Sequence, residues 1–295
     1  MVKLKKIICI VFVLTCIVFG GYMIKSKMAK DHTPPEITCT EETISVSVED
    51  GESALMEGIT ATDNRDGDIT KSVRVASMSH FINGKRTVEY VVFDKANHIG
   101  TLKRTVEYTD YTSPKIHMSR PLRYSLSETK NVNLSENLSA EDCLDGDLTN
   151  QIRTILDDSY YSGSAGAFPV TLQVSNSAGD VCSVQVELTL TDNEDRTESR
   201  KQYPLLSDYI AYTTVNNPID PGSYLIGLEQ NGSEYTYEAD GEMLAGTREA
   251  IGINSKVDYS TPGVYPVEYT YSADGVITAV TRLYVVVEGE QDGEE

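Results

Sequence analysis

Residues 61–70 read ATDNRDGDIT, and residues 140–149 read AEDCLDGDLT. Both stretches follow the pattern x-Asp-x-x-Asp-Gly-Asp-(Ile/Leu)-Thr, which indicates that one structural unit occurs at least twice in the chain. Each stretch is followed by two alternating apolar runs, VEYVVFDKANHIGTLKRTVEY from Val88 and VTLQVSNSAGDVCSVQVEL from Val170. A third such pair, VEYTYSADGVITAVTRLYVVV, begins at Val267. Apolar residues at every second position on both sides of a short polar turn predict a half-buried β-hairpin.

The three hairpins predict an all-β chain of tandem β-sandwich modules, because short alternating strands between turn signals are typical of that architecture. Proline-containing segments precede the first two repeats, Thr33-Pro34-Pro35 and Ser113-Pro114, and they favour stiff, extended connections. The third repeat lacks the Asp-Gly-Asp unit, so we interpret it as a diverged copy. The expected modules are residues 33–110, 111–192 and 205–288.

A different kind of boundary separates the last two predicted modules. Residues 193–204 begin with a strongly charged run, which predicts a flexible linker. The first two modules would then form a stiff stalk, with the third module at its tip. Residues 289–295 form an acidic tail.

The N-terminal segment is the one stretch of the sequence suited to a membrane. Lys3, Lys5 and Lys6 precede an apolar run at residues 7–24, which is long enough to span a bilayer as a helix. We therefore expect a short cytoplasmic N-terminus at residues 1–6, a transmembrane signal anchor at 7–24 and a juxtamembrane linker at 25–32. The chain would lie in the cell membrane as a single-pass protein with an extracellular C-terminal part. The alternative is a signal sequence that is cleaved after about residue 30.

The charge of the chain limits its partners. There are 45 acidic and 25 basic residues, which gives a net charge of −20. Such a surface repels nucleic acid, so we expect no nucleic-acid partner and a membrane contact only through the N-terminal helix. The acidity fits a soluble surface domain, or alternatively a rod that binds cations.

The motifs also resemble a known family. Thr-Pro-Pro-x-Ile at the start of the first module, the acidic turn, and Val-x-Tyr-x-Val-x-Asp-x-Ala-x-Asn from Val88 resemble bacterial surface immunoglobulin-like domains of the pesticidal crystal protein type, which are similar to hyalin repeats. The resemblance implies an extracellular location. It leaves open adhesion, ligand recognition and a purely structural role.

The same resemblance implies a disulfide between Cys143 and Cys182, because similar repeats carry cysteine at both positions. The alternative is two unpaired thiols. Cys39 has no partner cysteine in its own module and is expected to be free.

The acidic turns are the only site-like feature of the sequence. Their carboxylates suggest calcium, a hard cation that prefers oxygen ligands, and we expect no other cofactor. The alternative is structural, because aspartates in turns cap backbone amides and glycine supplies a positive φ. The candidate residues are Asp63, Asp66 and Asp68 in the first module and Asp142, Asp145 and Asp147 in the second.

We expect no enzymatic activity. The chain has four histidines, none in a zinc-binding spacing, and it contains no nucleophile elbow or phosphate-binding loop. The sequence favours adhesion or ligand recognition, with a protein or glycan ligand at the tyrosine-rich third module. The alternatives are a structural spacer or accessory subunit of an envelope complex, and a carbohydrate-active enzyme that uses a pair of carboxylates.

Overall fold

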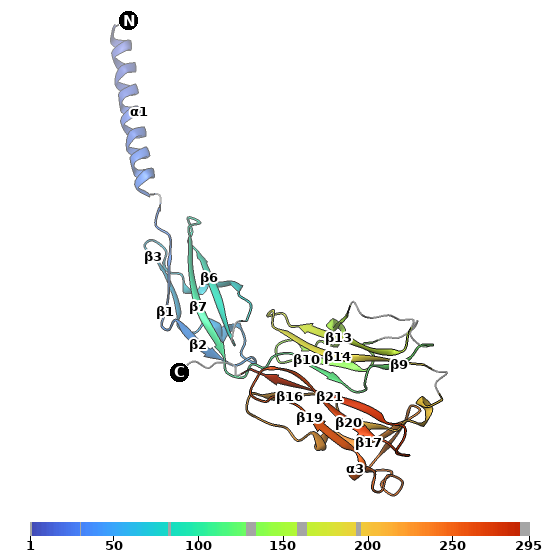
Figure 1. Cartoon of the computed structure of the whole chain (residues 1–295). Coiled ribbons are helices and arrows are strands. Elements are labelled where there is room, and N and C mark those ends of the chain that lie inside the picture. Colours follow the sequence, from blue (N-terminus) through green and yellow to red (C-terminus); the bar gives the residue numbers. More distant parts are fainter. Residues whose placement is uncertain are drawn as a thin grey trace. The chain divides into compact units, whose positions relative to one another are not determined.

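The computed structural model describes residues 2–29, 31–81, 84–127, 134–157, 164–192 and 196–289. These residues form two compact units, residues 1–110 and 111–295, which we describe separately (Figure 1). Six short β-sheets make up most of the structure, which confirms the predicted all-β class.

The first unit begins with helix α1 (Val2–Ala29). Within the described part of the chain, no helix combines the length and the apolar character that crossing a bilayer requires. The structure therefore does not support the transmembrane anchor that we predicted at residues 7–24.

Two sheets form the sandwich of the first unit, with strand orders β1-β3-β4 and β2-β7-β6-β5. Strands β6 and β7 are the two arms of the predicted hairpin, and β2 pairs in parallel with the outer edge of β7. Alternate residues of β6 point inward, and Val88, Tyr90 and Val92 are completely buried. The elements are β1 (Glu36–Cys39), β2 (Thr43–Val46), α2 (Glu52–Leu55), β3 (Ile59–Asp63), β4 (Gly67–Asp68), η1 (Thr70–Ser72), β5 (Arg74–Met78), β6 (Lys85–Phe93) and β7 (Ile99–Tyr108).

The second module repeats this arrangement strand for strand. Its sheets have the orders β11-β10-β8 and β12-β13-β14-β9, and β9 again pairs in parallel with the second arm of the hairpin. The elements are β8 (Lys115–Met118), β9 (Arg123–Ser125), β10 (Leu138–Asp142), β11 (Gly146–Asp147), η2 (Thr149–Gln151), β12 (Arg153–Leu156), β13 (Gly166–Ser175) and β14 (Val181–Thr191).

The third module keeps the topology although its sequence has diverged. Its sheets have the orders β15-β17-β18 and β16-β21-β20-β19, with β16 parallel to β21. A two-residue turn, Asn231-Gly232, joins β17 to β18 with positive φ at both positions. The elements are η3 (Glu198–Arg200), β15 (Tyr203–Leu206), β16 (Ile210–Thr214), η4 (Pro221–Tyr224), β17 (Leu225–Gln230), β18 (Ser233–Thr236), α3 (Thr247–Ala250), β19 (Gly252–Ser255), β20 (Gly263–Tyr271) and β21 (Ala279–Glu288).

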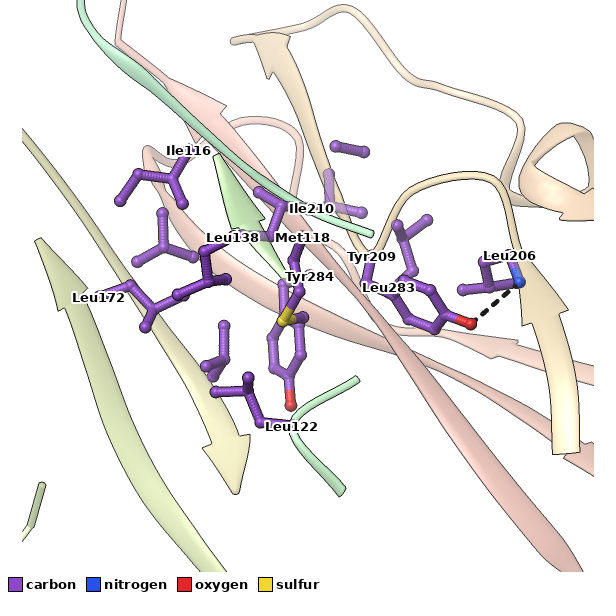
Figure 2. Packing of buried hydrophobic residues seen from close by; sticks show 14 of the residues in the cluster. Ile116, Met118, Leu122, Leu138, Leu172, Leu206, Tyr209, Ile210, Leu283 and Tyr284 are labelled. Carbon is purple, nitrogen blue, oxygen red and sulfur yellow. Dashed lines mark hydrogen bonds between the residues drawn. The ribbon is translucent and has the colours of Figure 1, made fainter. Parts of the chain in front are cut away.

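The second and third modules share one hydrophobic core, part of which Figure 2 shows. The amide of Tyr209 donates to the carbonyl of Met118 (3.0 Å), and the amide of Met118 donates to the Asp208 carboxylate (3.2 Å). The Tyr212 hydroxyl accepts from the amide of Ile116 (2.8 Å) and donates to the carbonyl of the same residue (2.9 Å). Backbone groups of one module are therefore satisfied by the other module, and the two modules form one body.

Ion pairs at the rim of this shared core support the same conclusion. Arg282 of the third module pairs with Glu187 of the second and with Glu268 of its own hairpin. Arg123 of the second module pairs with Glu229 of the third.

The structure therefore differs from the expectation of a flexible linker at residues 193–204 and a separate module at the tip. Residues 193–195 lie outside the described residues, and strand β15 already begins at Tyr203. The charge of the segment indicated solvent exposure, but one of its charged side chains pairs with the third module and two others pair with each other. These pairs are Arg200–Asp274 and Lys201–Glu198, both at 2.7 Å.

Since the core is shared, we expect the second and third modules to unfold together. Leu172 and Leu283 are completely buried, one in each module. Leu172→Ala and Leu283→Ala should each lower the unfolding free energy by about 2–5 kcal/mol. In calorimetry of the full chain, both variants should shift the same transition and leave the transition of the first unit in place. Shifts of two separate transitions would contradict a common core.

Candidate functional site

The two acidic turns have the same internal hydrogen bonds. Oδ1 of Asp63 accepts from the amides of Arg65 and Asp66, both at 2.8 Å. Asp142 accepts from the equivalent amides of Leu144 and Asp145, at 2.8 and 3.0 Å. The glycine of each motif has a φ near 70°, which residues with a side chain rarely adopt. These contacts are the capping interactions expected of a structural turn.

The other two carboxylates of the first turn point to separate partners. Asp66 accepts from the amide of Lys95 (2.7 Å) and from its ammonium group (3.0 Å). Asp68 accepts from the amide of Thr70 (3.0 Å). The hydrogen bonds from Lys95 lower the pKa of Asp66, and those from Thr70 lower the pKa of Asp68.

The second turn repeats this division. Asp145 accepts from the amide of Ser177 (2.5 Å) and from its hydroxyl (2.7 Å), and Asp147 accepts from the amide of Thr149 (2.9 Å). The hydrogen bonds from Thr149 lower the pKa of Asp147. Among the described residues, neither predicted set of three aspartates forms a group whose oxygens lie close enough together to hold one ion.

A different group of carboxylates meets in the first module. Asp31, Asp63 and Asp94 each offer an oxygen, and these oxygens lie within 4.8 Å of one another. Asp31 precedes β1, Asp63 ends β3, and Asp94 follows β6, so the group joins the leading segment to both sheets. Asp63 and Asp94 are only 8% and 6% exposed, and the Asp31 side chain is 8% exposed.

The members of this cluster differ in how far their oxygens are satisfied. Asp31 accepts from the amides of His32 (2.8 Å) and Thr33 (3.2 Å). Asp94 accepts from the amide of His98 (2.7 Å), and its other oxygen lies 2.6 Å from Nδ1 of the same residue. Burial opposes ionisation of Asp94, but the hydrogen bonds from His98 outweigh it and lower the pKa. Oδ2 of Asp31 pairs with Arg65, whereas Oδ2 of Asp63 is buried and has no hydrogen-bond partner.

The corresponding position of the second module carries an amide. Asn176 starts the hairpin turn after β13, as Asp94 does after β6, and the two turns close with the same backbone hydrogen bonds. The Asn176 side-chain amide donates to Asp142 (3.1 Å) and to the Tyr111 hydroxyl (2.8 Å), which in turn donates to Asp180 (2.7 Å). Both oxygens of Asp142 are therefore satisfied, in contrast to those of Asp63.

Sequence reasoning singled out Asp63 but missed Asp31 and Asp94. Asp31 lies in the segment that we interpreted as a linker, and Asp94 lies in a hairpin turn. The replacement of Asp94 by Asn176 in the aligned hairpins was the signal in the sequence that distinguishes the two modules.

Cys143 and Cys182, the pair that we expected to form a disulfide, are both free cysteines in the structure. The exposed Cys143 thiol donates to the carbonyl of Thr112 (3.1 Å), whereas Cys182 is buried beside the Tyr212 hydroxyl (3.5 Å). Burial raises the pKa of the Cys182 thiol. Cys182 thus faces the core that its module shares with the third module, which the pattern of a single repeat does not reveal.

Two histidines contact carboxylates in the described chain, His98 with Asp94 and His117 with Asp208 (2.8 Å) and Glu141 (3.6 Å). Neither ring is hydrogen-bonded to a serine or cysteine side chain there, so neither forms the base–nucleophile pair of acyl-transfer enzymes.

The third module, where we expected a ligand to bind, does not present its tyrosines as fully exposed rings. All six are buried or partly buried and pack against the core. The Tyr269 and Tyr265 hydroxyls donate to the carbonyls of Pro221 (2.6 Å) and Thr261 (2.9 Å). The six residues are Tyr235, Tyr237, Tyr259, Tyr265, Tyr269 and Tyr271.

The second unit has a concave polar surface where its two modules meet. This groove has a volume of about 1040 Å³. Within it the Arg123 guanidinium lies 3.4 Å from the centre of the Tyr203 ring, and Arg120 pairs with Glu234 (2.7 Å). Charged side chains from both modules line it, including Arg120, Arg123, Lys201, Glu198, Glu229 and Glu234.

Comparison with known proteins gives one family match. Residues 30–108 match the model of the HYR domain, which supports the predicted immunoglobulin-like, hyalin-repeat type for the first module. No sequence among the curated proteins matches the chain.

Among solved structures, the chain is similar to the CBM51-2 and INT domains of Clostridium perfringens ZmpB in complex with GlcNAc, with 21% identity over 54% of this chain and 42% of that one and a TM-score of 0.21. It is also similar to Drosophila N-cadherin EC1-4, with 11% identity over 88% and 76% and a TM-score of 0.23. Domains 6–7 of the surface layer protein SbsC match with 13% identity over 53% and 98% and a TM-score of 0.19. The chain spans 42%, 38% and 41% of the length of the three ZmpB structures that it matches.

The thiol arrangement predicts a clear order of reactivity. With N-ethylmaleimide, Cys143 should react in the native protein, whereas Cys182 should react only after unfolding, because it is buried and its pKa is raised. Mass spectrometry of peptides from both states measures this order. A pair of peptides linked through Cys143 and Cys182 would contradict it.

The amide of Asn176 is expected to stabilise the second unit. In Asn176→Asp the donor to Asp142 is lost and a second carboxylate takes its place, so the unfolding free energy should fall by about 1–3 kcal/mol. Chemical denaturation measures the change. If the Asn176→Asp variant unfolded at the same denaturant concentration as the wild type, this hydrogen bond would contribute nothing to stability.

Proposed function

We propose that the chain is an extracellular, non-catalytic protein of the bacterial surface whose tandem immunoglobulin-like modules act in adhesion or ligand recognition. One observation carries the proposal: the first module matches the HYR domain, and its strand order recurs in the second and third modules. Since a fold hosts many functions, the choice between binding and catalysis rests on the side chains.

Those side chains support binding. The two histidines that contact carboxylates have no nucleophile beside them in the described residues. The carboxylates of the acidic turns are held by hydrogen bonds within the turn or to the adjacent hairpin. The acidic exterior suits a protein that stays soluble at a surface and binds no nucleic acid.

The proposed ligand, a protein or a glycan, binds in the groove of the second unit. The groove combines arginines, glutamates and a tyrosine ring. Ion pairs between the second and third modules and the contact of Arg123 with the ring hold these side chains in place before a ligand binds. Groups held in place in this way lose little conformational freedom on binding. The tyrosine surface of the third module is not part of the proposal, because those rings pack against the core.

The alternative function is that of a spacer. It is favoured by the shared core of the second and third modules, because a rigid two-module body keeps the groups attached to its two ends a fixed distance apart without binding a ligand.

Binding of the labelled full chain to a glycan array and to a panel of purified extracellular matrix proteins tests the proposal. We expect saturable binding to at least one ligand, weakened about tenfold by Arg120→Ser, since loss of a charged contact costs about 1–3 kcal/mol. The matched control is Lys103→Ser, which removes an exposed cation from the first unit and should leave binding unchanged. No saturable binding on either panel would support the spacer instead.

A further inference from the structure

We propose that Asp31, Asp63 and Asp94 of the first module bind one calcium ion. This inference is independent of the proposed ligand groove, because all three residues belong to the first unit and the groove belongs to the second.

The spacing of the carboxylates fits a single ion. Calcium binds oxygen at about 2.3–2.6 Å, so two ligands on opposite sides of the ion lie roughly 5 Å apart. The three oxygens of the cluster lie within 4.8 Å of one another. Carboxylates bind calcium through one or both oxygens, and water completes its shell of six to eight ligands.

The cluster contains a buried oxygen that the protein leaves unsatisfied. Asp63 is 92% buried, since only 8% of it is exposed, and its Oδ1 is fully used by two amides of the turn. Its Oδ2 has no hydrogen-bond partner. A buried charged oxygen without a partner is costly, and a cation bound between the three carboxylates removes that cost.

The neighbouring basic side chains contact the other carboxylates and leave Oδ2 of Asp63 without a partner. Nε of Arg65 forms an ion pair with Asp31 at 4.0 Å. The His98 ring contacts Asp94, and Lys95, which is largely exposed, pairs with Asp66 rather than with the cluster. None of these contacts involves Asp63.

The second module provides an internal comparison. There, the position of Asp94 is taken by Asn176, whose amide group donates to Asp142, the counterpart of Asp63. The two modules therefore differ in how the second oxygen of this buried aspartate is satisfied. The second module neutralises its buried carboxylate with an amide donor, and the first module presents a carboxylate where that donor would be.

Bound calcium would tie the leading segment to the sandwich. Asp31 lies on that segment, Asp63 on one sheet and Asp94 at the end of the other sheet. The segment already packs closely on β7, because a Cβ at Gly100 would collide with the carbonyl of Pro35. The ion would add a second attachment and hold the start of the module rigid.

Calorimetric titration of the chelator-treated full chain with CaCl₂ tests the site. We expect one equivalent to bind with a Kd of ~0.1–1 mM, the range of extracellular calcium modules. The ion should raise the Tm of the first unit by several degrees and leave that of the second unit unchanged, because it binds only the folded first module.

The decisive variant is Asp94→Asn, which copies the amide of the second module. It should still fold without calcium, because removing one of three clustered charges offsets the loss of the ion pair between Asp94 and His98. It should also weaken calcium binding about tenfold or more, since affinity depends on the number of charged ligands. The matched control, Asp142→Asn in the second module, should bind calcium as the wild type does.

Three results would overturn the proposal. The first is the absence of saturable heat and of any Tm shift up to ~10 mM CaCl₂, well above the expected range. The second is full calcium binding by Asp94→Asn. The third is tighter binding of MgCl₂ than of CaCl₂, which would refute calcium as the ion.

Discussion

The register of the long hairpin is the constraint on which each module depends. In the first module β6 and β7 pair from Lys85 with Glu107 to Phe93 with Ile99, and this register places one side of both strands in the core. It also decides where the turn begins, and so it places Asp94 beside the end of β3. A shift of one residue would turn the apolar side to solvent and move Asp94 away from Asp63. The acidic cluster is therefore a consequence of the pairing that builds the core.

The equivalent hairpin of the third module explains why the second and third modules form one body. Strand β21 carries Leu283 into the core and Tyr284 toward the second module, where its hydroxyl accepts from the amide of Glu187 (2.8 Å). Arg282, the residue before Leu283, pairs with Glu187 and with Glu268. Three consecutive residues thus contribute to the core of one module and to its contact with the next. Such a strand is buried on both sides, and its sequence is correspondingly apolar from Leu283 to Val287.

Much of the fold was predictable because its signals are local. Alternation and turn composition lie within about twenty residues, so they identified all three hairpins and the acidic turns correctly. The errors concern contacts between distant segments. Cys143 and Cys182 share a module, but one contacts Thr112 and the other faces Tyr212 of the third module. The charged segment after residue 192 predicted separation, but the strands that flank it pack in one core.

The candidate site was predictable only in part, for the same physical reason. The repeated motif contains Asp63, and its capping hydrogen bonds belong to the turn itself. Asp31 and Asp94 approach Asp63 from segments about thirty residues away on either side, so no local pattern contains all three. The comparison of the two modules is more informative than the motif they share. A motif that recurs unchanged is required by the structure of the turn. The exchange of Asp94 for Asn176 changes the charge at a buried position, although the hairpin turn closes with the same backbone hydrogen bonds in both modules. A difference between repeats of one fold is therefore the better indicator of a site, because the structural requirement is the same in both and only the chemistry differs.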